Sequence, residues 1–310
     1  MKVLITGGSG FIGSHIAKRF VSEGHEVVIL DNLSTGRLEN IAAFADKVSF
    51  HRGDIRNQAL LTKLAKDCDL VYHQAAVVSV PYSVEYPQET HDVNIQGTLN
   101  VLLAARDQKV KRVVFACSAA IYGDDPELPK RENMAAAPIA PYGIEKITGE
   151  YYCNVFNKLY GVETVALRYF NVFGPRQDPT SPYSGVISIF VDRVLAKATP
   201  LVFGDGGQFR DFVFVDNVVQ ANYLAGTVDK AAGGVYNVGL GQKTTLNELL
   251  AMLGRITEQD VKPEYREERA GDIRESVADV SKIKRELGYD PKVGVEEGLR
   301  ALVEYEESQR

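Results

Sequence analysis

Residues 1–172 alternate short apolar runs with longer segments of helical periodicity, and this alternation restricts the possible folds more than any other feature. The runs are rich in Val, Ile and Leu and comprise residues 3–6, 26–30, 48–52, 70–73, 112–116 and 163–168. Apolar runs of about five residues separated by helices are typical of parallel strands covered on both faces. The pattern predicts a doubly wound α/β domain with a parallel sheet.

Beyond residue 172 the pattern changes. Gly, Pro, Asp and Ser concentrate at 173–185 and 204–207, and helical patterns return at 246–257, 280–287 and 295–306. We expect residues 173–211 and 241–310 to form a smaller C-terminal α/β lobe that binds the substrate. The segment 212–240, with a strand at 235–238, is expected to return to the sheet of residues 1–172.

Composition excludes several classes of partner. The 310 residues include 45% hydrophobic and 25% charged residues, as in an ordinary globular protein. A net charge of −6 repels polyanions, so nucleic acid is not an expected partner. The widely spaced Cys68, Cys117 and Cys153 predict neither disulfides nor a metal site, which favours the reducing cytoplasm. No apolar stretch approaches the roughly 20 residues of a membrane span, so no membrane association is expected.

A glycine-rich turn follows the first predicted strand directly, with the sequence Gly7-Gly8-Ser9-Gly10-Phe11-Ile12-Gly13. Gly7 permits a tight turn, Gly10 lets a pyrophosphate approach the backbone, and Gly13 lets the helix pack closely on the strand. The N-terminus of the helix then offers free N–H groups to an anion. The motif predicts the dinucleotide site of a Rossmann-type domain, with a ligand-free glycine loop as the alternative for the motif alone.

Asp31 ends the second predicted strand, 18 residues after Gly13. A carboxylate at this position accepts hydrogen bonds from the ribose hydroxyls and repels a 2′-phosphate, which favours NAD over NADP. Arg37 is the one residue that favours NADP. Further cofactor contacts are expected from Phe11 and Ile12 and from the loops after the second, third and fourth strands, at Asn32, Ser34, Gly36, Asp54, Ile55, Ala75 and Ala76.

Tyr142 and Lys146 are four residues apart in a segment with helical periodicity, so both side chains lie on one face. A tyrosine with a pKa near ~10 is a poor base, but a neighbouring ammonium and a positively charged nicotinamide stabilise the phenolate. Ser118 follows the fifth strand and points into the crevice where such sheets bind ligands. The spacing alone also fits a surface tyrosine beside a solvated lysine.

These motifs, with Asp31-Asn32-Leu33-Ser34 and Ile121-Tyr122-Gly123, resemble the extended short-chain dehydrogenase/reductases. Within them the chain looks most like the UDP-glucose/UDP-N-acetylglucosamine 4-epimerases, over essentially its whole length. The resemblance implies NAD as cofactor and a catalytic triad of Ser118, Tyr142 and Lys146. It also implies cofactor contacts at Asn94, Tyr142, Lys146, Tyr169 and Val172.

The resemblance extends to the substrate site. It implies that Asn171 contacts a phosphate, that Arg210 binds the diphosphate, and that Arg269 and Asp272 hold phosphate and ribose. Two arginines converging on a pyrophosphate would bind it through charge-assisted bidentate hydrogen bonds. The full set of implied substrate contacts is Ser79, Ser118, Tyr142, Asn171, Val186, Ile187, Val202, Gln208, Arg210, Arg269, Asp272 and Ser276.

The expected reaction is interconversion of UDP-Glc with UDP-Gal, and of UDP-GlcNAc with UDP-GalNAc, through a transient 4-keto sugar. Related sugar 4,6-dehydratases and UDP-glucuronate decarboxylases place acidic residues where this chain has Ala119 and Ala120, and methyl groups do no acid–base chemistry. Uronate epimerases commonly have Thr where this chain has Asn171. The small Ser276 stands where a bulky aromatic residue excludes the N-acetyl group in relatives, and residues 182–187 resemble the loop of members that prefer acetylated sugars.

Alternatives remain at this point. They are a UDP-uronate or UDP-pentose 4-epimerase, a UDP-glucuronate decarboxylase, and a non-catalytic NAD-binding sensor or scaffold. The resemblance also implies a homodimer built on a four-helix bundle, to which residues 88–108 and 142–159 of each subunit contribute. The alternative is that these helix faces are buried within their own subunit.

Overall fold

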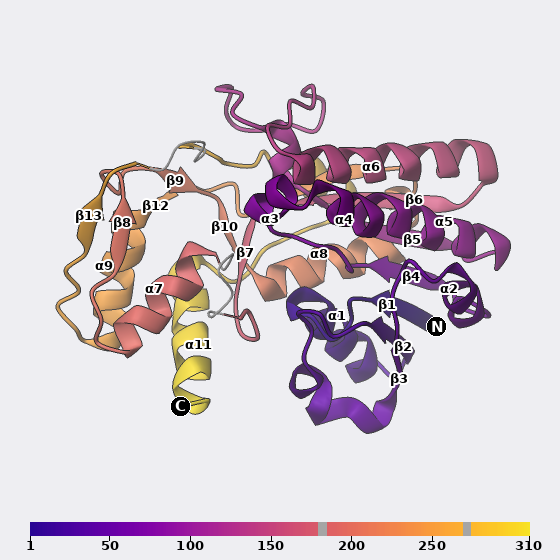
Figure 1. The fold of residues 1–310 in the computed structure, drawn as a ribbon, viewed down its shortest axis with the longest axis horizontal. Coiled ribbons are helices and arrows are strands. Elements are labelled where there is room, and N and C mark those ends of the chain that lie inside the picture. The colour runs from indigo at the N-terminus through magenta and orange to yellow at the C-terminus, as the bar shows by residue number, and fades with distance from the viewer. Residues whose placement is uncertain (179–184, 269–273) are drawn as a thin grey trace.

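The computed structural model describes residues 1–178, 185–268 and 274–310, arranged as a larger lobe and a smaller lobe (Figure 1). A sheet of seven parallel strands forms the centre of the larger lobe, in the order β11-β6-β5-β4-β1-β2-β3. The strands are β1 (Lys2–Thr6), β2 (Glu26–Asp31), β3 (Val48–Arg52), β4 (Leu70–His73), β5 (Arg112–Ser118), β6 (Glu163–Tyr169) and β11 (Val235–Val238). The predicted doubly wound, Rossmann-type sheet is confirmed.

Helices cover both faces of the sheet, which is why its central strands are mostly apolar. On one face α1 (Phe11–Ser22) packs against α8 (Val215–Thr227). On the other face α2 (Gln58–Leu64), α5 (Gly97–Asp107) and α6 (Pro141–Tyr160) pack in sequence. Short 3-10 helices at Leu38–Lys47, Ala119–Tyr122 and Asp229–Ala231 connect these elements.

The helix α6 is 20 residues long and has clear local start and stop signals. Pro141 occupies its first turn, where a missing N–H costs nothing, and Gly161 ends it with a left-handed φ of +70°. The segment predicted as one helix at 88–108 consists of α4 (Pro87–His91), a π-helical turn (Asp92–Gln96) and α5. The short helix α3 (Val80–Glu85) precedes α4 and contacts α6.

The described residues of the smaller lobe include α7 (Val186–Leu195), α9 (Leu246–Thr257) and α11 (Val295–Ser308), and α10 (Ser281–Leu287) packs near β11. Two small sheets complete it, β8 (Leu201–Phe203) with β13 (Glu264–Arg266), and β9 (Phe209–Arg210) with β12 (Thr244–Thr245). The parallel pair β7 (Asn171–Phe173) and β10 (Phe212–Phe214) lies between the lobes. Among the described residues, no helix combines the length and apolarity needed to cross a membrane.

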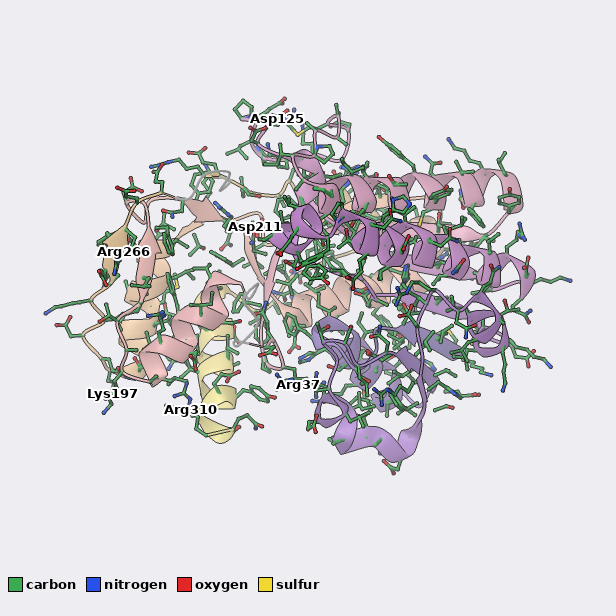
Figure 2. All side chains as sticks on the ribbon, viewed as in Figure 1. Arg37, Asp125, Lys197, Asp211, Arg266 and Arg310 are labelled. Atoms are coloured by element: carbon green, nitrogen blue, oxygen red, sulfur yellow. The ribbon has the colours of Figure 1, made fainter. Side chains whose placement is uncertain are left out.

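A buried carboxylate joins the lobes. Asp211, located between the lobes in Figure 2, accepts hydrogen bonds from the backbone N–H groups of Leu240 (2.7 Å), Gly241 (2.9 Å) and Ala278 (3.1 Å). Burial raises the pKa of Asp211 to about 6, although these N–H groups oppose the shift. The contacts tie β9 and β10 to the end of β11 and to the segment that carries Ser276.

Candidate active site

A cavity of about 400 Å³ opens at the carboxyl ends of the sheet strands, and we call it the larger-lobe cavity. The glycine turn, the ends of β2 and β5, and the first turns of α6 contribute to its wall. Every predicted cofactor residue except Asn94 lines it: Gly7, Gly10, Phe11, Ile12, Gly13, Asp31, Asn32, Ser34, Gly36, Asp54, Ile55, Ala75, Ala76, Tyr142, Lys146, Tyr169 and Val172. Ser118 lines the same cavity.

The glycine turn allows very close approach of backbone to backbone. Gly7 has a φ of +68°, and a Cβ atom on it would lie 2.7 Å from the backbone nitrogen of Ala75. A Cβ atom on Gly13 would lie 2.1 Å from the carbonyl oxygen of Gly7. Side chains here would fill the space in front of the N-terminus of α1, where a pyrophosphate is expected to bind. This arrangement fits a dinucleotide.

Asp31 lies at the end of β2, nearly buried, with its carboxylate held in place. It accepts hydrogen bonds from the backbone N–H groups of Ser9 (2.9 Å) and Leu33 (2.8 Å). A Cβ atom on Gly36 would lie 2.7 Å from Asp31 Oδ1, so the absent side chain leaves that side of the carboxylate accessible. Arg37 forms an ion pair with Asp178 at 2.6 Å. Asp31 thus presents a carboxylate to the larger-lobe cavity, whereas Arg37 is paired with Asp178.

Ser118, Tyr142 and Lys146 meet where β5 approaches α6. The Lys146 ammonium donates to the carbonyl oxygen of Ala116 over 2.8 Å, and the backbone N–H of Tyr142 donates to Ser83 Oγ over 3.1 Å. Burial raises the pKa of Tyr142 to about 12, although a side-chain hydrogen bond with Ser118 opposes this shift. Burial lowers the pKa of Lys146 to about 8. The Lys146 nitrogen lies 5.8 Å from the centre of the Tyr142 ring, and burial outweighs the expected stabilisation of the phenolate.

Asn94 does not line the larger-lobe cavity but is hydrogen-bonded to Val77, which does. Its side-chain amide accepts from the backbone N–H of Val77 (2.8 Å) and donates to the carbonyl oxygen of Val77 (2.9 Å). It also donates to Glu145 Oε2 over 2.6 Å, and Thr90 Oγ1 donates to Glu145 Oε1 over 2.6 Å. Asn94 thus connects α6 to the segment after β4, a role that sequence spacing gave no means to detect.

A second cavity of about 430 Å³ lies in the smaller lobe, and we call it the smaller-lobe cavity. Of the predicted substrate residues, Asn171, Val186, Gln208 and Arg210 line it. Six further residues of its wall were missed by the sequence analysis: Ile189, Phe190, Arg193, Leu201, Phe203 and Leu246. Helical periodicity groups those on α7 with Val186, and strand alternation pairs the two on β8, but neither pattern indicates which face meets a ligand.

Gln208 lines the smaller-lobe cavity and carries a buried acceptor. Its Nε2 donates to the carbonyl oxygen of Phe203 over 2.6 Å, and the side chain is only 7% exposed. Its Oε1 has no hydrogen-bond partner within the described parts of the chain. Because buried amide oxygens are rarely left without a donor, this atom fits a ligand that donates a hydrogen bond. Apolar side chains and Arg210 complete a wall suited to an elongated ligand with an anionic part.

Several predicted substrate residues lie outside both cavity walls. The side chain of Val202 is fully buried on the opposite face of β8, and Ile187 packs into the core from α7. Ser79 caps α3 by accepting from the backbone N–H of Tyr82 (3.0 Å). Ser276 is half-buried next to Arg210, and its N–H donates to the carbonyl oxygen of Phe209 over 3.2 Å. Arg269, Asp272 and the loop residues 182–184 lie outside the described residues.

The strand β7 contributes to both cavities, because Asn171 lines the smaller-lobe cavity and Val172 the larger-lobe cavity. A dinucleotide fold with Ser, Tyr and Lys in its cavity, and a second cavity in the smaller lobe, is typical of a cofactor-dependent enzyme that acts on a hydroxyl or carbonyl group. A family model for the NAD dependent epimerase/dehydratase family matches residues 3–239. The chain belongs to this family, and NAD is its cofactor.

Individual relatives match the whole chain. The UDP-glucose 4-epimerase of Mycolicibacterium smegmatis is 40% identical over 311 residues, which cover 98% of each protein. The crystal structure of the Thermotoga maritima UDP-glucose 4-epimerase with UDP-glucose has a TM-score of 0.95 at 40% identity, covering 100% of this chain and 99% of that one. A UDP-N-acetylglucosamine 4-epimerase from Methanobrevibacter ruminantium, in complex with UDP-N-acetylmuramic acid, has a TM-score of 0.96 at 40% identity with the same coverage.

Proposed function

We propose that this protein is an NAD-dependent UDP-hexose 4-epimerase, an isomerase that interconverts UDP-Glc with UDP-Gal and UDP-GlcNAc with UDP-GalNAc. The observation that carries the proposal is that β7 contributes to both cavities. Ser118, Tyr142 and Lys146 line the larger-lobe cavity together with Val172, and Asn171 and Arg210 line the smaller-lobe cavity. The names of the three relatives described above support the same substrate class.

In the proposed reaction, Tyr142 removes the proton from O4 of the sugar, and Ser118 donates a hydrogen bond to that oxygen. The residues that line the larger-lobe cavity would hold NAD, which would supply the hydride acceptor and donor for C4 and a positive charge that favours the Tyr142 phenolate. Lys146 keeps its ammonium beside Tyr142 through its bond to Ala116. Tyr142 finally returns the proton to O4. Because both the proton and the hydride return to the sugar, the reaction involves no net oxidation.

Epimerisation requires that the 4-keto sugar turn its other face toward the cofactor while the nucleotide stays bound. We assign Arg210 and Asn171 to the diphosphate and the apolar wall of the smaller-lobe cavity, with the acceptor of Gln208, to the nucleoside. Arg269 and Asp272 are further candidates from the sequence. Arg210 and Asn171 would bind the diphosphate strongly. The sugar, which is assigned no charged partner, would remain free to turn.

Two features favour this reaction over its neighbours. Ala119 and Ala120 follow Ser118 in a 3-10 helix, so this turn offers no acid or base for elimination or decarboxylation. Ser276 is small where an aromatic residue is expected to exclude the N-acetyl group in relatives, and its backbone N–H donates to Phe209, the residue before Arg210. We therefore include UDP-GlcNAc and UDP-GalNAc among the substrates.

We also propose a homodimer. Tyr151, Val155 and Leu159 recur every four residues on α6 and are 58%, 43% and 71% exposed. An apolar stripe of this length on a 20-residue helix favours packing against a second copy. The proposed interface is a four-helix bundle of α6 and the segment 87–107 from each subunit.

Three buried free cysteines support a cytoplasmic protein. We further propose two functional units: residues 1–172 with 212–240 bind NAD, and residues 173–211 with 241–310 bind the UDP-sugar.

The proposal is tested by incubating the purified protein, without added NAD, with each of UDP-Glc, UDP-GlcNAc, UDP-glucuronate and UDP-xylose, and separating the products. We expect the 4-epimers of the first two and no product from the other two. Release of CO₂, a 4-keto-6-deoxy sugar, or turnover of UDP-glucuronate alone would assign the protein to one of the neighbouring activities.

A further inference from the structure

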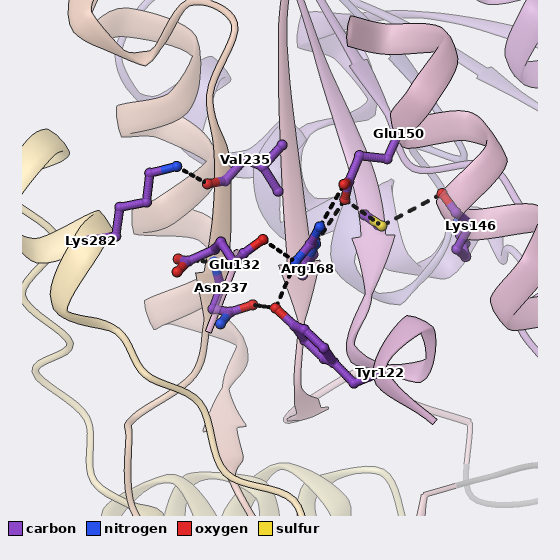
Figure 3. A network of polar contacts seen from close by, with 9 residues as sticks. Tyr122, Glu132, Lys146, Glu150, Arg168, Val235, Asn237 and Lys282 are labelled. Atoms are coloured by element: carbon purple, nitrogen blue, oxygen red, sulfur yellow. Dashed lines mark hydrogen bonds and ion pairs between the residues drawn. The ribbon is translucent and has the colours of Figure 1, made fainter. Parts of the chain in front are cut away.

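A buried ion pair lies directly behind the catalytic residues and takes no part in the reaction described above. Arg168 on β6 is 5% exposed and forms two hydrogen bonds to Glu150 on α6, from Nε to Oε2 (2.8 Å) and from Nη2 to Oε1 (2.6 Å). Its remaining nitrogen, Nη1, donates to the hydroxyl of Tyr122 over 2.8 Å and to the carbonyl oxygen of Glu132 over 3.1 Å. Figure 3 shows Arg168 between Glu150 and Tyr122.

Glu150 lies on the same face of α6 as the catalytic residues. Tyr142, Lys146 and Glu150 are spaced four residues apart, so they follow one another along the helix. The thiol of Cys117, next to Ser118, contacts both Glu150 Oε2 (3.4 Å) and the carbonyl oxygen of Lys146 (3.6 Å). A two-pronged bond between Arg168 and Glu150 therefore fixes the rotation of α6 about its axis at the level of Lys146.

Tyr122 connects Arg168 to the other side of the site. It ends the 3-10 helix that starts directly after Ser118, and its hydroxyl donates to Asn237 Oδ1 on β11 over 2.7 Å. Strand register places Arg168 beside Cys117, with Tyr169 beside Ser118. One guanidinium group thus contacts both the helix that carries Tyr142 and Lys146 and the turn that begins at Ser118.

We propose that Arg168 is a positioning residue for the reaction, which acts through Glu150 on Tyr142 and Lys146 and through Tyr122 on Ser118. A buried ion pair is no more stabilising than well-packed apolar residues, so its stability does not explain its place behind the site. The planar guanidinium, in contrast, sets both distance and orientation of a carboxylate, which a lysine does not. This proposal rests on the proposed function, because the residues that Arg168 positions are those of the proposed reaction.

The same two strands carry a matched control at their opposite ends. Arg112 on β5 is 1% exposed and forms an ion pair with Glu163 on β6 at 2.7 Å. Its Nη1 donates to carbonyl oxygens at the end of α8, including that of Val228 at 2.7 Å. Arg112 is therefore buried, paired and hydrogen-bonded like Arg168, but it belongs to the edge of the sheet away from both cavities.

The experiment compares Arg168→Lys with Arg112→Lys in the full-length holoenzyme. Both variants keep a positive charge and lose the planar guanidinium. Because small displacements of reacting groups can cost about 100-fold in rate, we expect Arg168→Lys to lower kcat by about that factor while KM for the UDP-sugar stays close to the wild-type value. Arg112→Lys is expected to lower the thermal midpoint and to leave kcat unchanged.

Hydrogen exchange supplies a readout that does not need turnover. In Arg168→Lys, amides of residues 142–150 should exchange faster, whereas those of α1 should not change. If the wild-type protein turns over no UDP-sugar, the proposed function fails, and exchange at 142–150 still decides whether Arg168 holds α6 in place.

Tyr122→Phe removes a single hydroxyl from the same network and provides a milder variant, for which we expect a smaller loss of kcat. A wild-type kcat in both Arg168→Lys and Tyr122→Phe would overturn the proposal. Equal losses of kcat in Arg168→Lys and Arg112→Lys, or unchanged exchange at residues 142–150 in Arg168→Lys, would also overturn it.

Discussion

The Lys146 ammonium donates a hydrogen bond to the carbonyl oxygen of Ala116 over 2.8 Å, and this bond ties α6 to β5 two residues before Ser118. The helix that carries Tyr142 and Lys146 is therefore anchored to the strand that ends at Ser118. Burial raises the pKa of Tyr142 to about 12, so the phenol is protonated in the free protein near neutral pH. The proposed role of Tyr142 as a base therefore requires that bound substrate and cofactor lower the pKa of its phenol.

Tyr142→Phe removes the proposed base and little else, because the ring stays and only the hydroxyl is lost. General base catalysis contributes about 10²–10⁴-fold, and we expect kcat to fall by that amount, as measured by product separation after incubation with UDP-Glc. Tyr151→Phe is a suitable control because Tyr151 is on the same helix and 58% exposed. Undiminished turnover in Tyr142→Phe would remove Tyr142 from the mechanism.

Ser276→Tyr should change the choice of sugar. An aromatic ring beside Arg210 would fill the space expected for the N-acetyl group, whereas UDP-Glc needs no such space. We expect kcat/KM for UDP-GlcNAc to fall at least about tenfold relative to UDP-Glc, since rejection by filled space is worth about 1–3 kcal/mol. Ser276→Ala should keep both activities. Full activity of Ser276→Tyr on UDP-GlcNAc contradicts the assignment.

Asp31→Asn should weaken the preference for NAD over NADP. The amide is the same size as the carboxylate but lacks the charge that repels a 2′-phosphate, and it loses charge-assisted bonds from Ser9 and Leu33. One charged hydrogen bond is worth about 1.5–3 kcal/mol, so we expect NAD affinity to fall about tenfold or more in a fluorescence titration. NADP affinity should fall less. An unchanged ratio of the two affinities would show that Asp31 does not select the cofactor.

His73 should make the fold sensitive to acid. It is buried between Thr6 and Thr98, at 2.8 Å and 3.0 Å, and burial lowers its pKa from 6.5 to about 3. Below pH 6.5 the unfolded chain binds a proton that the folded protein does not, so this contribution to stability is complete above pH 6.5 and declines as pH falls toward 3. The decline is about 1.4 kcal/mol per pH unit.

Urea unfolding at pH 7 and pH 5 tests this contribution. His73→Gln lacks the titrating group, so its free energy of unfolding should fall less between the two pH values than that of the wild type. His51→Gln, at a half-buried position on β3, should behave like the wild type. Equal declines in wild type and His73→Gln would contradict the assignment.

The proposed dimer predicts that Val155→Glu combined with Leu159→Glu yields monomers in analytical ultracentrifugation. Two carboxylates on the apolar stripe of α6 would be desolvated without partners at the interface, which is costly. Lys158→Glu, on the same turn but outside the stripe, should leave the dimer intact. A wild-type protein that sediments as a monomer would contradict the interface.

The strands and most residues of the larger-lobe cavity were predictable because their signals are local. Buried parallel strands are mostly apolar, and a glycine turn or a Tyr-x-x-x-Lys spacing is complete within seven residues. Their positions at the carboxyl edge of the sheet then follow from the doubly wound topology. Asp31, for example, lies at the end of β2 as the spacing from Gly13 predicted.

The wall of the smaller-lobe cavity was less predictable because it depends on how elements dock. Ile187 and Val186 are neighbours on α7, and only the packing of that helix decides that Val186 meets the cavity and Ile187 the core. Asn94 and Arg168 act through partners more than 15 residues away in sequence, Glu145 and Glu150. Lys146 does not offset the rise that burial causes in the pKa of Tyr142. This result depends on the distance between the Lys146 nitrogen and the Tyr142 ring, which their spacing in the sequence does not give.

The central claim is that C4 of the sugar is oxidised and reduced within one active site, with Tyr142 handling the O4 proton. The most direct test uses UDP-Glc carrying deuterium at C4, incubated with the purified protein in ordinary water without added NAD. The account predicts UDP-Gal that retains the deuterium at C4. Loss of the deuterium to solvent, or a need for added reductant, would contradict it.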